Sequence, residues 1–373
     1  MNVTKRFLFG ISLVLTGLLV YIFQPEPLRS RVLSHEVTAL IFYACLGILS
    51  LACILSGWNS DERVDPSNKA VFITGCDSGF GHNLSIRLDR LGYTVFAGCL
   101  MPDREGAQQL KEATSDRLHI VAVDVTNDWQ VREAQKYVKE NIGDKALWAV
   151  VNNAGVAVFT EIEWCSVEQF ERVMDVNVFG VVRVTKAFLP LIRSSKGRVV
   201  NVASLAGRFT LPAFSAYSMS KKACIAFSDG LRLEMTKFDV KVITIEPGLY
   251  RTPISQEGYL IDMNRKSWAE TPTDVKNDYG EEYFESFLEN ITKQMRRARP
   301  NVDEVVDLMA KAVVTKFPKQ RYVPYWRSNL RAHILMALPN SITDKLLTAY
   351  TPKAPVEAKR RESDREKNNG SPK

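Results

Sequence analysis

Short apolar runs alternate with longer amphipathic stretches along most of this 373-residue chain, and this alternation constrains its fold more than any other feature. The runs have the length and composition of buried strands, and the stretches between them have the length and spacing of helices. Strands that alternate with helices pair in parallel through crossover connections. We therefore expect an α/β fold with a doubly wound parallel sheet. The predicted strands are 70–74, 93–100, 119–125, 147–152, 198–203 and 240–246.

The composition agrees with one large folded domain, which we place at residues 61–352. Hydrophobic residues make up 46% and charged residues 24% of the chain, which excludes a disordered or collagen-like protein. The stretch 254–299 breaks the alternation because it is polar, aromatic and helix-like. It follows the last predicted strand, where such folds bind ligands, so we expect a substrate lid there. Residues 353–373 are almost free of apolar side chains and are predicted to be a disordered charged tail.

Two uncharged runs, at 7–23 and 37–58, predict a membrane anchor over residues 1–60. As helices they would be about 26 and 33 Å long, against a hydrocarbon core of roughly 30 Å. We therefore expect an N-terminal transmembrane helical hairpin. The first run follows Lys5 and Arg6, as in a signal peptide, but no small-x-small cleavage site follows it. A mitochondrial presequence is the other alternative, although the continuous apolar run lacks the Arg- and Ser-rich amphipathic pattern of such a signal.

The distribution of charges and cysteines indicates which side of a membrane the large domain occupies and which partners are not expected. A hairpin places the amino terminus and the large domain on one side, and the weak excess of positive charge there assigns that side to the cytosol. The net charge of +7 is spread without a basic stripe interleaved with aromatics, so we expect no nucleic acid partner. The six cysteines include no C-x-x-C pair, so neither a metal site nor a disulfide framework is predicted.

A glycine cluster, TGCDSGFG from Thr74 to Gly81, joins the first predicted strand to the first helix. Glycines there allow backbone amides to approach a pyrophosphate, and the helix amino terminus favours its charge. The same pattern also occurs in tight turns that serve only packing. The cluster therefore predicts a dinucleotide site only together with other motifs.

The end of the second predicted strand bears on which dinucleotide binds. An acidic residue there would bind a ribose 2′-hydroxyl, and an arginine would accept a 2′-phosphate. This chain has Cys99 and Leu100 instead, with Asp77 adding negative charge in the glycine cluster. A phosphorylated ribose is therefore disfavoured, although Arg104 is near enough in sequence to reach it. We expect NAD as the cofactor and count Cys99 among the residues that bind it.

Tyr217 and Lys221 are four residues apart, which places them on one face of a helix. A phenol with its usual pKa of about 10 acts as a base near neutrality only if positive charge favours the phenolate. Lys221 and an oxidised nicotinamide ring would supply that charge. Ser204, at the end of a predicted strand, would hold a substrate oxygen. Taken alone, a Tyr/Lys pair is more often an exposed helix face.

Taken together, these motifs resemble the short-chain dehydrogenase/reductase family over about 69–254, half of the chain. The family implies a Rossmann-type fold and a hydride transfer between a substrate carbon and nicotinamide C4. In it, Tyr217 exchanges a proton with the substrate oxygen, Ser204 orients that oxygen, Lys221 binds the nicotinamide ribose, and Asn177 holds a water in the proton relay. The residues expected to bind the cofactor are Thr74, Gly75, Ser78, Gly79, Phe80, Gly81, Cys99, Asp124, Val125, Asn153, Ala154, Gly155, Tyr217, Lys221, Pro247, Gly248 and Thr252.

The phrases VFITGCDSGFGHNL and FLPLIRSSKGRVVNVASLAGR look like one membrane-associated branch of the family. That branch includes retinol dehydrogenases, 17-beta-hydroxysteroid dehydrogenase type 2 and D-beta-hydroxybutyrate dehydrogenase, most of them NAD-linked. The double apolar leader is similar to the steroid enzymes, whereas GCLM and KNDYGEEYF are similar to the hydroxybutyrate enzyme. A carboxylate substrate needs a cation, and Arg208, Arg251, Arg265 and Lys266 are candidates.

The resemblance implies an NAD-dependent alcohol dehydrogenase of steroid or lipid metabolism, acting on a lipophilic alcohol such as a hydroxysteroid or retinol. We expect it in the endoplasmic reticulum membrane with its catalytic domain in the cytosol, as a homo-oligomer; the alternative location is a mitochondrial membrane. The rival activity is that of a D-3-hydroxybutyrate dehydrogenase. A rival of another class is an inactive NAD-binding scaffold, which the complete set of Ser204, Tyr217 and Lys221 argues against.

Overall fold

The structure, a computed structural model, describes residues 43, 47, 62–349 and 351. Nearly all of the predicted hairpin, and the tail 353–373, lie outside the described residues. Among the residues that are described, no helix is long and apolar enough to cross a bilayer. Among the described residues, Val64–Val314 and those from Pro318 onward form one compact unit. The described residues up to Arg63 group with Thr315–Phe317 in the other unit.

The larger unit contains a seven-stranded parallel sheet in the order β3-β2-β1-β4-β5-β6-β7. This confirms the predicted Rossmann-type sheet. Strand β3 ends three residues before the predicted 119–125 does, so Asp124 and Val125 lie in the loop that follows it. Strand β7 was not predicted, because two residues show no periodicity. The strands are β1 Lys69–Thr74, β2 Thr94–Cys99, β3 Leu118–Ala122, β4 Ala146–Asn152, β5 Arg198–Val202, β6 Lys241–Ile245 and β7 Arg321–Tyr322.

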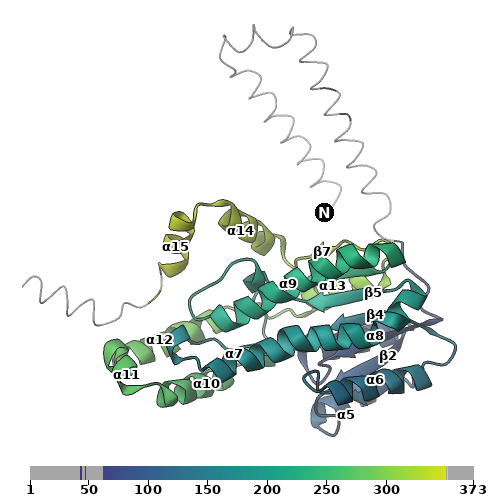
Figure 1. Cartoon of the computed structure of the whole chain (residues 1–373), viewed down its shortest axis with the longest axis horizontal. Helices are drawn as coiled ribbons and strands as arrows, with labels where there is room; N and C mark the ends of the chain where they lie inside the picture. Colours follow the sequence, from purple (N-terminus) through teal and green to yellow (C-terminus); the bar gives the residue numbers. More distant parts are fainter. Residues whose placement is uncertain (1–42, 44–46, 48–61, 350, 352–373) are drawn as a thin grey trace, which may run out of the picture. The chain divides into compact units, whose positions relative to one another are not determined.

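Helices cover both faces of the sheet (Figure 1). Val71 and Ile73 of β1 point to one face, and Ala70 and Phe72 point to the other, as the two-residue period of a strand requires. Because both faces are buried, the strands are continuously apolar. The first face carries α4 Gly79–Arg90, α5 Glu105–Glu112 and α13 Asp303–Val314, and the second carries α6 Asp128–Asn141, α8 Val181–Ser195 and α9 Ser215–Met235.

The stretch predicted as a lid forms helices α10 Glu257–Glu270, α11 Thr273–Tyr279 and α12 Glu281–Arg296, preceded by the short helix η5 Pro253–Ser255. These helices have an aromatic core of their own, apart from the two cores of the sheet. In it, the rings of Trp268 and Phe284 stack 4.7 Å apart, and Trp164 meets Trp268 edge to face at 4.8 Å. The predicted helical, aromatic character of this stretch therefore agrees with the structure.

The remaining helices are short or lie beyond the sheet. Helix α7 Val167–Met174 runs through the π-helical turn η2 Asp175–Gly180 directly into α8. Helices α14 Trp326–Ala337 and α15 Asn340–Thr348 follow β7, outside the two helix layers (Figure 1). The short helices are η1 Ile162–Trp164, η3 Leu205–Gly207 and η4 Thr236–Phe238.

Two tyrosines of the α10–α12 core predict how the fold responds to alkali. The Tyr283 hydroxyl donates to Glu161 at 3.1 Å, and the Tyr279 hydroxyl donates to Glu163. Burial first, and then the neighbouring carboxylates, raise the pKa of both phenols above 10. A raised phenol pKa contributes stability that is complete below pH 10 and is lost as the pH rises through the folded-state pKa. We expect the free energy of unfolding to fall steadily above pH 10.

Urea unfolding at a series of alkaline pH values, followed by tryptophan fluorescence, measures this effect. The double variant Tyr279→Phe/Tyr283→Phe lacks both titrating groups, so its free energy of unfolding should depend less steeply on pH. Tyr259, exposed on α10, supplies the matched control Tyr259→Phe, which should follow the parent protein. Equal slopes for the double variant and the control would contradict the assignment.

Candidate active site

A cavity of about 1360 Å³ opens where the loops after β1, β4, β5 and β6 meet. The order of the sheet explains its place, because β1 pairs with both β2 and β4, and the connections leave this point in opposite directions. The structure brings fifteen of the predicted residues to its wall: Gly75, Ser78, Gly79, Phe80, Asp124, Val125, Asn153, Ala154, Gly155, Ser204, Tyr217, Lys221, Pro247, Gly248 and Thr252.

The glycine cluster has the geometry of a phosphate-binding turn. Gly75 and Gly79 have φ values of +70° and +64°, which side chains rarely allow. A Cβ on Gly75 would lie 2.8 Å from the Cα of Ala154, so the turn packs directly against the loop after β4. Helix α4 begins at Gly79 with no acidic residue in its first turn. The residues present therefore fit a dinucleotide phosphate at this helix terminus.

Thr74 and Gly81, which were also expected to bind the cofactor, lie behind the cavity wall and support it. The Thr74 hydroxyl accepts hydrogen bonds from the backbone N–H groups of Asn153 and Ala154, both at 3.1 Å. The Asn153 amide donates to the carbonyls of Thr74 and Gly75 at 2.9 and 3.0 Å. A Cβ on Gly81 would lie 2.4 Å from the Gly75 carbonyl oxygen. Thr74 and Gly81 therefore hold the turn against β4 and do not line the cavity.

Cys99 also lies off the wall, in the core between β2 and its helices. Burial, with a smaller effect of Asp77, raises the pKa of its thiol to about 12. Leu100 lines the cavity in its place. Next to it, the Asp77 carboxylate accepts hydrogen bonds from the backbone N–H groups of Leu100 and Met101 at 2.9 and 2.8 Å. Asp77, which itself lines the cavity, thus joins the glycine turn to the end of β2.

Helix α9 carries Tyr217 in its first turn and Lys221 one turn later. The Lys221 Nζ lies 5.6 Å from the centre of the Tyr217 ring and donates to the Val202 carbonyl at 2.9 Å. Lys221 is only 5% exposed, so β5 holds its ammonium group at the end of the cavity nearest the sheet. Phe159 meets the Tyr217 ring edge to face at 5.4 Å. The ring and the cation are therefore brought together as the spacing predicts.

Ser204 lies in the loop after β5, two residues beyond the last residue of that strand. Its hydroxyl accepts a hydrogen bond from the Ala206 N–H at 3.1 Å and donates to the Pro247 carbonyl at 3.3 Å. These contacts fix the hydroxyl between the loop after β5 and the loop after β6. Ser204 and Tyr217 line the same cavity.

Asn177 lies within η2, buried behind the cavity wall. Its Oδ1 accepts from the Val156 N–H at 2.9 Å, and its Nδ2 donates to the Val156 carbonyl at 2.8 Å and to the Ser220 hydroxyl at 2.9 Å. A Cβ on Gly155 would lie 3.2 Å from Asn177 Oδ1 and 3.5 Å from Lys221 Nζ. Asn177 therefore positions the loop after β4, and its role in a water relay stays a prediction.

The sequence model described as short chain dehydrogenase matches residues 69–259, just over half of the chain. The chain belongs to the short-chain dehydrogenase family. This confirms the membership that the motifs predict. It also identifies the protein as an oxidoreductase whose fold binds a nicotinamide cofactor.

The relatives of this short-chain dehydrogenase include steroid and retinol enzymes. The 17-beta-hydroxysteroid dehydrogenase type 6 of Rattus norvegicus is 42% identical over 293 residues, which cover 78% of this chain and 91% of that protein. Retinol dehydrogenase 16 of Mus musculus is 41% identical over 281 residues, 75% of this chain and 88% of that protein. A short-chain dehydrogenase from Burkholderia cenocepacia in complex with NADP has a TM-score of 0.56 and 26% identity, covering 76% of this chain and 100% of that one.

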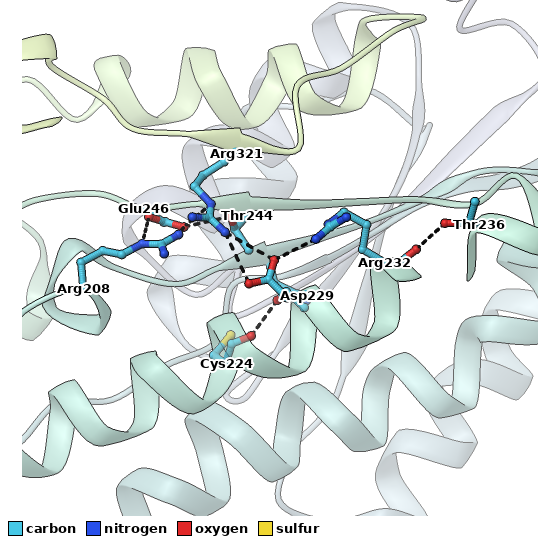
Figure 2. A network of polar contacts seen from close by, with 10 residues as sticks. Arg208, Cys224, Asp229, Arg232, Thr236, Thr244, Glu246 and Arg321 are labelled. Carbon is cyan, nitrogen blue, oxygen red and sulfur yellow. Dashed lines mark hydrogen bonds and ion pairs between the residues drawn. The ribbon is translucent and has the colours of Figure 1, made fainter. Parts of the chain in front are cut away.

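Arg208, a candidate for binding a substrate carboxylate, is instead paired within this short-chain dehydrogenase (Figure 2). Its guanidinium binds both oxygens of Glu246, at 2.8 and 2.6 Å, and this bond raises the arginine pKa. Arg321 Nε lies 3.1 Å from Glu246, and the Thr244 hydroxyl donates to the same carboxylate at 3.0 Å. Glu246 is 1% exposed, so its charge is balanced by two arginines from different segments.

This Glu246 network joins the segment after Ser204 to the end of β6 and to β7, and the sequence analysis missed it. A glutamate at the end of an apolar strand, in VITIEPG, was the available signal. The other candidate cations are also engaged away from the cavity wall. Arg265 lies 3.1 Å from Glu285, Lys266 lies 4.0 Å from Glu270, and Arg251 donates to the Arg296 carbonyl at 3.3 Å.

Proposed function

We propose that this short-chain dehydrogenase transfers hydride between NAD and a lipophilic alcohol or ketone, a hydroxysteroid or retinol. The observation that carries the proposal is one cavity that contains Ser204, Tyr217 and Lys221 together with the glycine turn. When bound, the nicotinamide ring supplies the hydride acceptor at C4. The protein supplies position, charge and a path for the proton.

The contacts of each polar residue support a role for it in the reaction. Tyr217 removes the hydroxyl proton of the alcohol as hydride leaves, and it returns a proton in the reverse direction. Ser204, fixed by Pro247 and Ala206, orients the substrate oxygen. Lys221 places its ammonium group 5.6 Å from the centre of the phenol ring. These parts use the chain's own groups and need no metal ligand.

The wall of the cavity supports a lipophilic substrate. Beside Tyr217 it contains side chains from loops far apart in sequence: Phe159, Phe209, Leu211, Phe214 and Leu249. Burying apolar substrate surface against them contributes roughly 25 cal/mol per Å². The names of the relatives, a hydroxysteroid and a retinol dehydrogenase, agree with such a substrate. The four cations suggested for the carboxylate of the rival substrate D-3-hydroxybutyrate lie off the wall, although Arg172, Arg183 and Arg331 line it.

The contacts of Asp77 support NAD over NADP. Its carboxylate lies between the glycine turn and the end of β2, where a bound adenosine ribose belongs in this fold. A phosphate at that ribose would meet a carboxylate that already accepts two backbone N–H groups. Repulsion between the two anions would disfavour NADP.

Asp77→Asn is therefore expected to improve the affinity for NADP relative to NAD by about tenfold, because it removes one unit of repelling charge from a partly screened site. Titration calorimetry of the full chain in detergent with each dinucleotide measures the ratio. Asp103→Asn, exposed in the loop after β2, is the matched control and should leave the ratio unchanged. An unchanged ratio for Asp77→Asn would remove Asp77 from the basis of cofactor choice.

We also propose the location and assembly that the sequence implies. The two uncharged runs at 7–23 and 37–58 support a membrane-embedded hairpin, with the catalytic domain on the cytosolic side of the endoplasmic reticulum. The substrate supports the same location, because a sterol or retinoid is dissolved in the membrane. We expect the α10–α12 helices to act as the substrate lid and the protein to form homo-oligomers.

One experiment tests the activity directly. Membranes containing the full chain are incubated with NAD and a panel of hydroxysteroids, retinol and D-3-hydroxybutyrate, and NADH absorbance is followed. We expect turnover of a hydroxysteroid or of retinol. Turnover confined to D-3-hydroxybutyrate would establish the rival activity. Dinucleotide binding without any turnover would favour the scaffold.

A further inference from the structure

Helices α14 and α15 expose an unusual number of large apolar side chains. Trp326, Leu330 and Ile334 of α14 are 55%, 51% and 50% exposed, and Ile342 and Leu346 of α15 are 45% and 53% exposed. Within each helix these residues are four apart, so each helix has an apolar stripe along one side. Exposed apolar side chains are ordinary when scattered singly, but a contiguous stripe marks a docking surface.

The stripe is not the side that α14 uses to pack on the domain. Ala332 and Leu335, which point to the opposite side of the helix, are only 2% and 7% exposed. A surface helix of a globular protein needs a single apolar face, the one turned to the core. Helix α14 has two apolar faces, and only one of them packs against the core.

The charges beside the stripe favour an anionic partner. Arg327 and Lys345 are exposed, and Asp344 is the one acidic residue in these two helices. An apolar helix face flanked by basic side chains is the pattern of a helix lying in a membrane interface, with anionic headgroups beside the cations. A symmetric contact with a second copy would bring the arginines of both copies together, which their repulsion disfavours.

The inner side of α14 reaches the active-site cavity. Ser328 and Arg331 line that cavity, and a Cβ on Gly248 would lie 3.8 Å from the Ser328 hydroxyl oxygen. The Thr343 hydroxyl donates to the Leu335 carbonyl at 3.2 Å, which ties α15 to α14. One helix thus has a cavity wall on one side and the apolar stripe on the other.

We propose that the α14–α15 stripe lies in the interface of an anionic lipid bilayer. Trp326, Leu330, Ile334, Ile342 and Leu346 contact the acyl chains, and Arg327 and Lys345 contact the headgroup phosphates. The same chain carries two uncharged runs of membrane-spanning length in its first 60 residues, so a bilayer is a partner that its own sequence predicts. Docking then opens the cavity toward an alcohol dissolved in the lipid, and this step rests on the proposed function.

Lipid contact is measured on the full chain, reconstituted in vesicles of phosphatidylcholine with phosphatidylserine. Ile334→Cys carries an environment-sensitive fluorophore, and the matched control Leu233→Cys carries it on α9, where Leu233 is 67% exposed. The parent chain, labelled in parallel, gives the signal from the native cysteines. We expect brominated lipid to quench the label at 334 severalfold more than the label at 233, and less so in pure phosphatidylcholine.

Equal quenching at the two positions would overturn the proposal. So would shielding of the label at 334 that needs no lipid and grows with protein concentration, because that result assigns the stripe to a second copy. Both readouts are independent of turnover, so the surface and the proposed function fail separately.

The double variant Leu330→Glu/Ile334→Glu tests the link to the substrate. Neither side chain lines the cavity. We expect the KM for a vesicle-dissolved alcohol to rise severalfold, while the KM for NAD and the kcat in detergent stay the same. An unchanged KM in vesicles would contradict the entry route, and a loss of kcat in detergent would show that the variant disturbs the site itself.

Discussion

Tyr217→Phe is expected to lower kcat by about 10³-fold, the usual contribution of a positioned acid or base. The substitution removes one hydroxyl and keeps the ring, so the contacts with Phe159 and with the Lys221 ammonium group remain. Affinity for the dinucleotide should therefore be close to that of the parent protein. Steady-state NADH absorbance gives the rate, and calorimetric titration with NAD gives the affinity.

Tyr259→Phe is the control for Tyr217→Phe, because Tyr259 is exposed on α10 and does not line the cavity. Its kcat should equal that of the parent protein. Retention of full activity by Tyr217→Phe would refute the proposed role of the phenol. Loss of both activity and NAD binding would indicate a disturbed fold, which circular dichroism of the variant checks.

Glu246→Gln is expected to lower the free energy of unfolding by about 3 kcal/mol, because removal of one partner leaves buried charge unbalanced. The side chain keeps its shape but loses the charge that faces Arg208 and Arg321 (Figure 2). Arg208 is 18% exposed and Arg321 is 39% exposed, so both regain some water, which keeps the loss at the low end of the range. Urea unfolding of the full chain in detergent measures it.

A matched surface pair separates burial from charge. Asp239 and Lys241 form an ion pair whose side chains are 63% and 46% exposed. Asp239→Asn should therefore cost less than about 1 kcal/mol. Similar losses for Glu246→Gln and Asp239→Asn would mean that the Glu246 network contributes no more than a surface pair. A fall in kcat for Glu246→Gln would add that the network positions the segment after Ser204.

The fold was predictable because its signal is local and repeated. Buried parallel strands are continuously apolar, and the helices between them have a regular period, so six strands could be located from the sequence. Strand ends were less certain, as with β3, because apolar residues such as Val123 and Val125 continue into the loop. Strand β7 pairs with β6 through two residues, and only the assembled sheet defines it.

The candidate site also has parts that local motifs predict and parts that only the assembled fold defines. The glycine turn and the Tyr217–Lys221 pair are short motifs, and the structure brings them to one cavity. The expectation that Cys99 binds the cofactor stays a prediction, because its side chain belongs to the core and Leu100 lines the cavity. The apolar wall and the partners of Glu246 come from distant segments, such as Phe159 with Leu249, and no sequence period relates them.

The π-helical turn η2 affects the orientation of the helices on either side of it. A single residue added to an α-helix rotates everything after it by about 100°. A wide turn confines the surplus residue to one place, so α7 and α8 keep their own apolar sides against the protein. Here the wide turn contains Asn177, whose side chain turns inward to the loop after β4. A helix of this kind can acquire an inward-facing polar group without changing the register of the helical turns on either side.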